Sequence, residues 1–85
     1  MFFHYRDLVQ VNNKEKLLLQ FASHLSKVRA QKQLSIRQLA AASGLEYSQL
    51  QRIEKGKVNL SFTTLITIAQ GLEIHPKELL DFEFD

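Results

Sequence analysis

Cysteine is absent from this sequence, and its 85 residues include only one proline and three glycines. Without cysteine there is no disulfide framework and no thiolate zinc site, which fits a reducing cytoplasm. The scarcity of proline and glycine, with a hydrophobic content of 45%, argues against disorder. Long apolar runs are also lacking, and Asp7 lies among the first residues, so we expect neither a membrane span nor a signal peptide. The sequence therefore predicts one small domain that is soluble and cytoplasmic.

The net charge of +2 hides an uneven distribution along the chain. From residue 27 to residue 57 there are seven lysines and arginines against two glutamates, a balance of +5. From residue 73 to residue 85 there are five acidic residues and one lysine, a balance of −4. A basic middle and an acidic end suggest that one face meets a polyanion, although solvated surface charge explains the same pattern equally well.

Apolar residues recur at steps of three and four along most of the chain, which predicts helices. A first helix is expected to begin at residue 12 or 13, where an asparagine can cap it, and to end between residues 31 and 33. Ser35 and Gln38 have the spacing of a capping box that opens a short second helix. Gly44 is expected to end that helix, because glycine adopts the left-handed conformation without a Cβ clash.

Three further helices are expected after Gly44. Glu46 can cap a third helix that stops at Gly56, and Ser61 can cap a fourth. After residue 71, Pro76 suits the first turn of a fifth helix that ends near residue 80. The side chains expected to face the core are Leu17, Leu18, Phe21, Leu25, Val28, Ile36, Leu39, Ala40, Leu50, Ile53, Phe62, Leu65, Ile66 and Ala69. The predicted fold class is all-α, a compact bundle of five helices.

The two ends of the chain follow a different pattern, in which apolar residues alternate over residues 1–11 and 82–84. This imperfect alternation allows a short strand at each end. So many large apolar groups are not expected to stay in water. We interpret them as part of a dimer interface, with the alternative that they cap the helical bundle of their own chain. The residues concerned are Phe2, Phe3, Tyr5, Leu8, Val9, Val11, Phe82 and Phe84.

The middle of the chain has the organisation of a helix-turn-helix, with two short helices joined through a glycine turn and an unburied polar face on the second. Leu39 and Ala40 supply an apolar and a small residue before the turn at Gly44. Leu50 and Ile53 supply two core positions after it. Ala40 is expected to be small because the third helix crosses close over it. These residue types at this spacing together indicate a helix-turn-helix far more specifically than any single motif does.

The spacing resembles the Cro- and phage-repressor-like (XRE-type) family of helix-turn-helix proteins. The matching residues read LS…R…LA…G…S…L..IE.GK from Leu34 to Lys57 and TL..IA..L.I…EL from Thr64 to Leu79, within residues 25–80. The resemblance implies a lambda-repressor-like bundle that binds a palindromic operator in double-stranded DNA as a homodimer and regulates transcription. The chain then divides into an arm (1–12), the DNA-binding domain (13–81) and a tail (82–85). We expect no cofactor and no metal site.

The resemblance makes the third helix, at about residues 46–54, the recognition helix that enters the major groove with its N-terminal end. The residues expected to reach base edges are Tyr47, Ser48, Gln51 and Arg52. Arginine is the strongest of these candidates, because its two donors match a guanine edge. The residues expected at the sugar-phosphate backbone are Arg37, Gln49, Lys55, Lys57 and Asn59. An exposed helix face with solvated side chains is the alternative for each.

Arg29 and Glu54 are expected to pair between the first and third helices, because members of the family often carry a basic and an acidic residue at these places. We interpret this pair as structural.

Two positions depart from the family pattern. Ile36 stands where a glutamine often touches a phosphate, so that contact is expected to be lost. Glu46 brings a negative charge to the DNA-facing end, either as a helix cap or as an acceptor for a cytosine amino group.

Catalysis is not expected. His4, His24 and His75 are far apart and have no partners at metal-ligand spacing, and helix caps or DNA contacts account for the serines. We therefore expect a nucleoid-associated regulator of prokaryotic type, either a repressor or a controller of restriction-modification or prophage genes. One alternative is the antitoxin of a toxin–antitoxin pair, whose ends bind a protein partner. The other is a protein-interaction module that has lost DNA binding, against which Arg52 and the basic middle argue.

Overall fold

The computed structural model of the chain describes residues 13–84, and these residues are all-α, as predicted. Their elements are α2 (Asn13–Gln31), α3 (Ile36–Ser43), α4 (Tyr47–Glu54), α5 (Phe62–Leu72) and the 3-10 helix η1 (Pro76–Leu80). Among these residues, no helix combines the length and the apolar character that crossing a bilayer requires.

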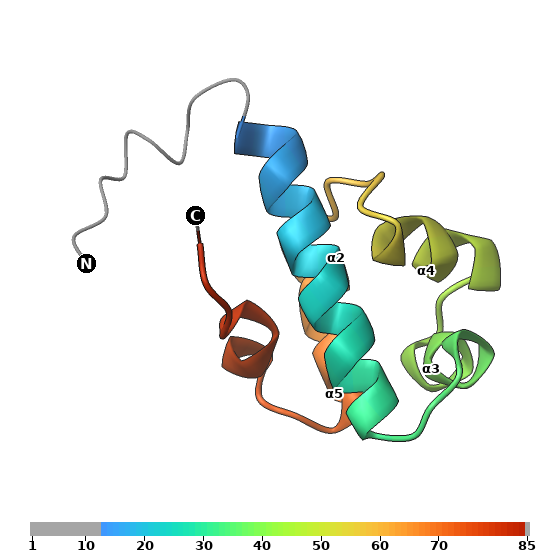
Figure 1. The fold of residues 1–85 in the computed structure, drawn as a ribbon. Coiled ribbons are helices and arrows are strands. Elements are labelled where there is room, and N and C mark those ends of the chain that lie inside the picture. The colour runs from blue at the N-terminus through green and yellow to red at the C-terminus, as the bar shows by residue number, and fades with distance from the viewer. Residues whose placement is uncertain (1–12, 85) are drawn as a thin grey trace.

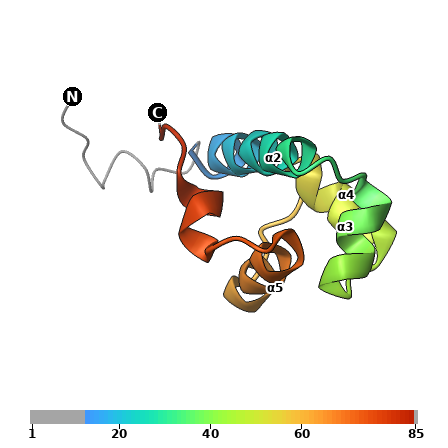
Figure 2. The same cartoon turned by 90° about the horizontal axis from the view of Figure 1, so that it is seen from below.

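The long helix α2 organises the fold (Figure 1), because every other element lies against it or beside it. The α3–α4 pair lies on one side of α2, and η1 lies on the other side. Figure 2, seen from below, shows α5 lying under α2 between these two groups. The buried apolar side chains where these elements meet are Phe21, Ala22, Leu25, Leu39, Ala40, Leu50, Ile53, Ile68, Ala69, Leu72 and Leu79.

The start and the end of α3 are formed as the sequence predicts. The Ser35 hydroxyl accepts a hydrogen bond from the Gln38 N–H at 3.0 Å, and the Gln38 side-chain oxygen accepts one from the Ser35 N–H at 2.8 Å. At the other end Gly44 has a φ of 71°, and the following Leu45 N–H donates to the Ala40 carbonyl at 2.9 Å. This turn fixes the direction in which the chain enters α4.

The predicted inward face of α5 is wrong at its first residue. Phe62 is 74% exposed, while Ile68, which the sequence analysis did not place in the core, is fully buried. Helix α5 turns residues 65, 68, 69 and 72 toward α2 and α3, which is the repeat of one helical face. Phe62 is the first residue of α5, one turn before the first of these residues, and its side chain lies largely in solvent.

Gly71 does not end α5, which continues to Leu72 and closes at Glu73 in the left-handed conformation, with a φ of 58°. The glycine instead permits a close approach between α5 and α3. A Cβ at Gly71 would overlap the Ser43 hydroxyl and would lie 3.2 Å from the Ser43 Cα. The Ser43 hydroxyl is buried there without a hydrogen-bond partner among the described residues. Contact between these two helices therefore requires a residue without a side chain.

The predicted fifth helix is a five-residue 3-10 helix, so the prediction of five α-helices is not confirmed. Pro76 does lie in its first turn, and Leu79 anchors it in the core. Residues 82–84 contain no strand, which corrects the expectation for the C-terminal end. Instead Phe82 folds back to contact Phe21 and His24, at ring-centroid distances of 6.5 and 5.3 Å. The N-terminal strand and arm were predicted for residues 1–12, which lie outside the described residues.

Candidate nucleic-acid interface

Helix α4 has one face in the core and one face in solvent. Leu50 and Ile53 are fully buried and hold the helix against α2 and α3. On the other face Ser48, Gln49 and Arg52 are exposed. An eight-residue helix with only two buried positions has little hydrophobic anchoring of its own, so its orientation depends on contacts at its two ends.

At the N-terminal end of α4, Tyr47 connects this helix to α3. The Arg37 guanidinium lies over the Tyr47 ring, 4.2 Å from its centroid, which is a cation–π contact. One turn further along α4, the Gln51 side-chain N–H donates to the Tyr47 hydroxyl at 3.4 Å. Tyr47 and Gln51 are half-buried by this arrangement, whereas Arg37 stays exposed. Three residues predicted as separate contacts are therefore one connected group.

At the C-terminal end of α4, the Glu54 carboxylate forms the predicted pair with Arg29 of α2. The Arg29 Nε donates to one carboxylate oxygen at 2.7 Å. The Ser26 hydroxyl donates to the other oxygen, also at 2.7 Å. The Glu54 side chain is only 4% exposed and that of Arg29 is 18% exposed, so the charges attract each other largely out of water.

Arg29 has a second role in the same contact. Its Nη1 donates to the Leu34 carbonyl at 2.7 Å, in the turn that leads from α2 into α3. Arg29 and Glu54 therefore hold three segments together, namely the end of α2, the entrance to α3 and the end of α4. Sequence reasoning found the ion pair and missed Ser26. The available signal was its position three residues before Arg29, which puts both on one face of α2.

The segment after α4 presents the remaining predicted residues. Lys55, Lys57 and Asn59 are all exposed. The chain reverses at Gly56, which has a φ of 73°, and the Lys57 N–H donates back to the Arg52 carbonyl at 3.2 Å. This hydrogen bond ties the segment to the last turn of α4, so its basic side chains lie next to the solvent face of the helix.

The other predicted positions have structural roles in the described chain. Ala40 is buried, and Gly44 makes the turn into α4. Ile36 is half-buried and packs against the core, which agrees with the interpretation that it extends the core. Glu46 is the N-cap residue of α4, but its side chain makes no capping hydrogen bond. The interpretation of Glu46 as a side-chain cap is therefore not confirmed.

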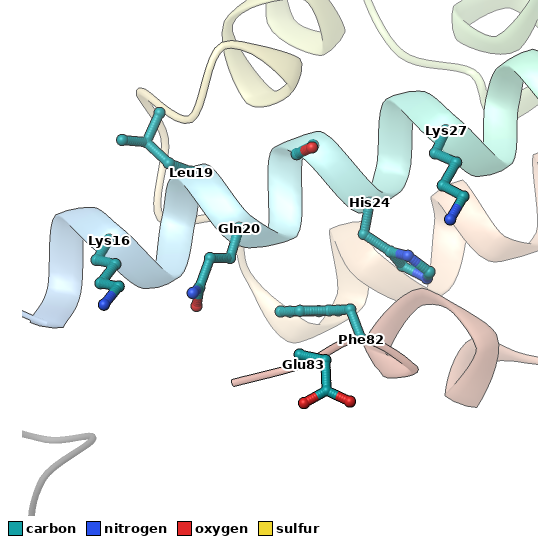
Figure 3. A pocket seen from close by; sticks show the side chains of 8 residues that line it. Lys16, Leu19, Gln20, His24, Lys27, Phe82 and Glu83 are labelled. Carbon is teal, nitrogen blue, oxygen red and sulfur yellow. The ribbon is translucent and has the colours of Figure 1, made fainter. Parts of the chain in front are cut away.

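A hollow with a volume of about 420 Å³ lies elsewhere, on α2 beside the C-terminal tail. Figure 3 shows Lys16, His24 and Lys27 along α2, with the Phe82 ring beside His24 and the Glu83 carboxylate directed away from the helix. The His24 Nε2 is 2.7 Å from the Glu78 carbonyl oxygen, so its ring holds η1 in place. Within residues 13–84, no group of three or more side chains of the metal-binding types gathers.

Comparisons with known proteins show the family of this chain and solved structures that resemble it. A sequence profile of the Cro/C1-type HTH DNA-binding domain matches residues 24–85. The restriction-modification controller protein C.AhdI from Aeromonas hydrophila is 36% identical, with a TM-score of 0.73 over 75% of this chain and 97% of that one. The wild-type restriction-modification controller protein C.Esp1396I is 28% identical, with a TM-score of 0.67 over 79% of this chain and 96% of that one. No curated protein matches the sequence.

The Arg29–Glu54 contact predicts strong coupling between the two residues. Arg29→Met leaves the buried carboxylate without its cation and should lower the free energy of unfolding by about 3–5 kcal/mol. Adding Glu54→Gln removes the uncompensated charge, so the double variant should be more stable than Arg29→Met alone. Urea unfolding followed by circular dichroism measures both, and Lys27→Met, an exposed change on the same helix, should stay within about 0.5 kcal/mol of the parent. Additive losses in the double variant would show that the residues act independently.

Proposed function

This chain belongs to the Cro/C1-type HTH DNA-binding family and is a DNA-binding transcriptional regulator, and we propose that it acts as a homodimer on a palindromic operator. The observation that carries the proposal is the solvent face of α4. That face is polar, and the basic segment formed by residues 55–59 follows it in the chain. Contacts to α2 and α3 fix the helix at both ends. A helix held in this way can enter the major groove without reorganising.

We assign base recognition to three polar residues of α4, namely Ser48, Gln51 and Arg52. Arg52 offers two parallel donors, which match the O6 and N7 acceptors of guanine. Ser48 can donate to or accept from a base edge. Gln51 is the third base-reading candidate, and its amide is already oriented by its hydrogen bond to Tyr47.

We assign backbone contact to the residues that surround this face. Lys55, Lys57 and Asn59 follow α4, and Gln49 lies on its exposed side. The three cations among the backbone candidates, Arg37, Lys55 and Lys57, give six phosphate contacts in a dimer. Six contacts predict that affinity falls roughly a thousandfold between about 50 and 200 mM salt.

We propose a second role for Tyr47 beside the base contact predicted from the sequence. Its ring lies under the Arg37 guanidinium and its hydroxyl accepts a hydrogen bond from Gln51. We propose that Tyr47 positions a backbone-contacting arginine and a base-reading glutamine. This role couples α3 and α4 at the place where they would meet DNA.

We also propose which genes the protein regulates. Both solved relatives are restriction-modification controller proteins, and each is matched over nearly its whole length. We therefore propose that this protein controls a restriction-modification operon, in preference to the antitoxin and the interaction module considered from the sequence.

The experiment that tests the proposed function is selection of bound duplexes from a random pool, followed by a salt titration. The expected result is an enriched palindrome with half-sites about one helical turn apart, roughly 34 Å, because each copy of a dimer presents one α4. Binding that is insensitive to salt, or a pool without any enriched motif, would contradict the proposal.

Arg52→Ala and Lys57→Ala should weaken binding in different ways. Arg52→Ala removes a base contact, so it should cost about 1–3 kcal/mol per half-site and relax the preference at one base pair. Lys57→Ala removes a phosphate contact, so it should weaken all duplexes alike and reduce the salt slope by about one per protomer. Titrating both variants against a panel of single-base operator changes measures the difference. Identical behaviour across the panel would contradict the division of roles.

Tyr47→Phe and Tyr47→Leu separate the two contacts of this residue. Phenylalanine keeps the ring under Arg37 and loses only the hydrogen bond from Gln51, so backbone affinity and the salt slope should stay close to the parent. Leucine removes the ring, so it should weaken all duplexes, as Arg37→Ala does. If Tyr47→Leu instead altered the preference at a single base pair and left other duplexes unaffected, Tyr47 would be a base-reading residue.

A further inference from the structure

Two acidic residues lie in the basic middle of the chain, and their surroundings differ. Glu46 and Glu54 are the two glutamates between residues 27 and 57. The Glu54 side chain is almost fully buried, and it accepts hydrogen bonds from Arg29 and Ser26. The Glu46 side chain is exposed at the N-terminal end of α4. One acid is therefore neutralised inside the protein, and the other faces solvent.

No cation among the described residues pairs with Glu46. The Arg37 guanidinium lies over the ring of the next residue, Tyr47, 4.2 Å from its centroid. Lys55 and Lys57 follow the opposite end of α4. Within residues 13–84, the Glu46 side chain makes neither a capping hydrogen bond nor an ion pair. Its negative charge is therefore uncompensated at the end of α4 that the proposed function directs into the major groove.

A carboxylate at this end of α4 opposes DNA binding in general. Duplex DNA carries one negative charge per about 1.7 Å of its axis, so it repels a second negative charge in the groove. The positive end of the helix dipole favours the carboxylate in the free protein and in the complex alike, so it does not offset this repulsion. A base that donates a hydrogen bond to the carboxylate would offset it, and only on a matching sequence.

The chemistry of the base edges selects the matching base. A carboxylate has acceptors and no donor. Cytosine presents a single donor in the major groove, its N4 amino group, whereas adenine places an N7 acceptor beside its N6 donor. Guanine presents two acceptors, and thymine presents one acceptor and a methyl group. A carboxylate is therefore best matched by cytosine and most strongly rejected by guanine.

We propose that Glu46 is a specificity-determining residue, which accepts a hydrogen bond from the N4 amino group of a cytosine in each half-site and weakens binding to other duplexes. This inference rests on the proposed function and names a base that the protein reads. Glu46 and Arg52 are six residues apart, about 9 Å along the helix axis, so they read different base pairs. Arg52 attracts its base, and Glu46 also rejects the wrong ones.

The first test is whether operator and scrambled duplexes respond in opposite directions. Glu46→Ala should weaken binding of the selected operator by about fivefold or more per half-site, because the contact to cytosine is lost. It should strengthen binding of a scrambled duplex at the same salt, because a repelled charge is removed. Circular dichroism should show parental helicity.

Glu78→Ala is the matched control. It removes the same charge from an exposed residue of η1, on the other side of α2 from α4, so the ratio of the two affinities should stay at the parental value. If Glu46→Ala strengthened both duplexes, Glu46 would be only a repelling charge. If it changed neither affinity, the side chain would be solvated in the complex. Either result would overturn the proposal.

The second test repeats the duplex selection with two variants. Glu46→Ala should lose the cytosine preference at one base pair per half-site and keep the rest of the motif. Glu46→Gln should move that preference toward adenine, because an amide can accept from N6 and donate to N7. A motif that is unchanged in both variants would contradict the inference while leaving the proposed function intact. A parent protein that selects no palindrome would contradict both.

The third test leaves the protein unaltered, so it does not depend on the folding of a variant. The cytosine identified by the selection is replaced in the operator by an analogue that lacks the exocyclic amino group. The parent protein should lose about fivefold or more in affinity per half-site, whereas Glu46→Ala should bind both operators equally. Equal losses for the two proteins would show that the amino group acts through the duplex and not through Glu46, which would overturn the proposal.

Discussion

The Glu54 carboxylate makes the contacts on which the arrangement of α3 and α4 depends. Buried at the end of α4, it accepts hydrogen bonds from Arg29 and Ser26 of α2, and Arg29 also holds the turn into α3. The two buried residues of α4 fix which face points inward, but they leave the tilt of a short helix weakly determined. The charged contact supplies that second restraint. A buried ion pair stabilises a fold little in itself, since desolvation offsets its attraction, but it specifies geometry because any other geometry leaves a charge unpaired.

The two sides of α2 carry different elements. One side carries α3, α4 and the basic residues after α4, held by contacts that leave their polar faces in water. The other side carries η1 and the tail, and an apolar hollow beside them is also lined by loop residues 59–61. The charge pattern of the sequence follows this separation only in part, because Lys27 and Lys32 of the basic middle line hollows that Glu83 and Asp81 also line.

The sequence predicted features that depend on local chemistry. The capping box at Ser35, the left-handed turn at Gly44 and the cap at Ser61 each need only residues within a few positions, and the structure confirms them. Prediction from the sequence failed where contacts between distant parts of the chain determine the structure. Phe62 has the spacing of an apolar helix position, but it lies beyond the end of the core. Position 71 requires glycine because Ser43 approaches it closely, and it does not mark the end of a helix. The stacking of Arg37 on Tyr47 joins two helices, so no spacing rule could have indicated it.

We propose that α4, with the start of α3 and the basic residues after α4, forms the DNA-facing surface. Backbone amide chemical shifts measured while the selected operator duplex is added test this surface residue by residue. The largest changes are expected at residues 36–38, 47–52 and 55–59, and only small ones at residues 76–84. A scrambled duplex at the same salt should affect the basic segment more than residues 48–52, because it offers phosphates without the matching bases. Changes centred on residues 76–84, with residues 47–52 unaffected, would contradict the account.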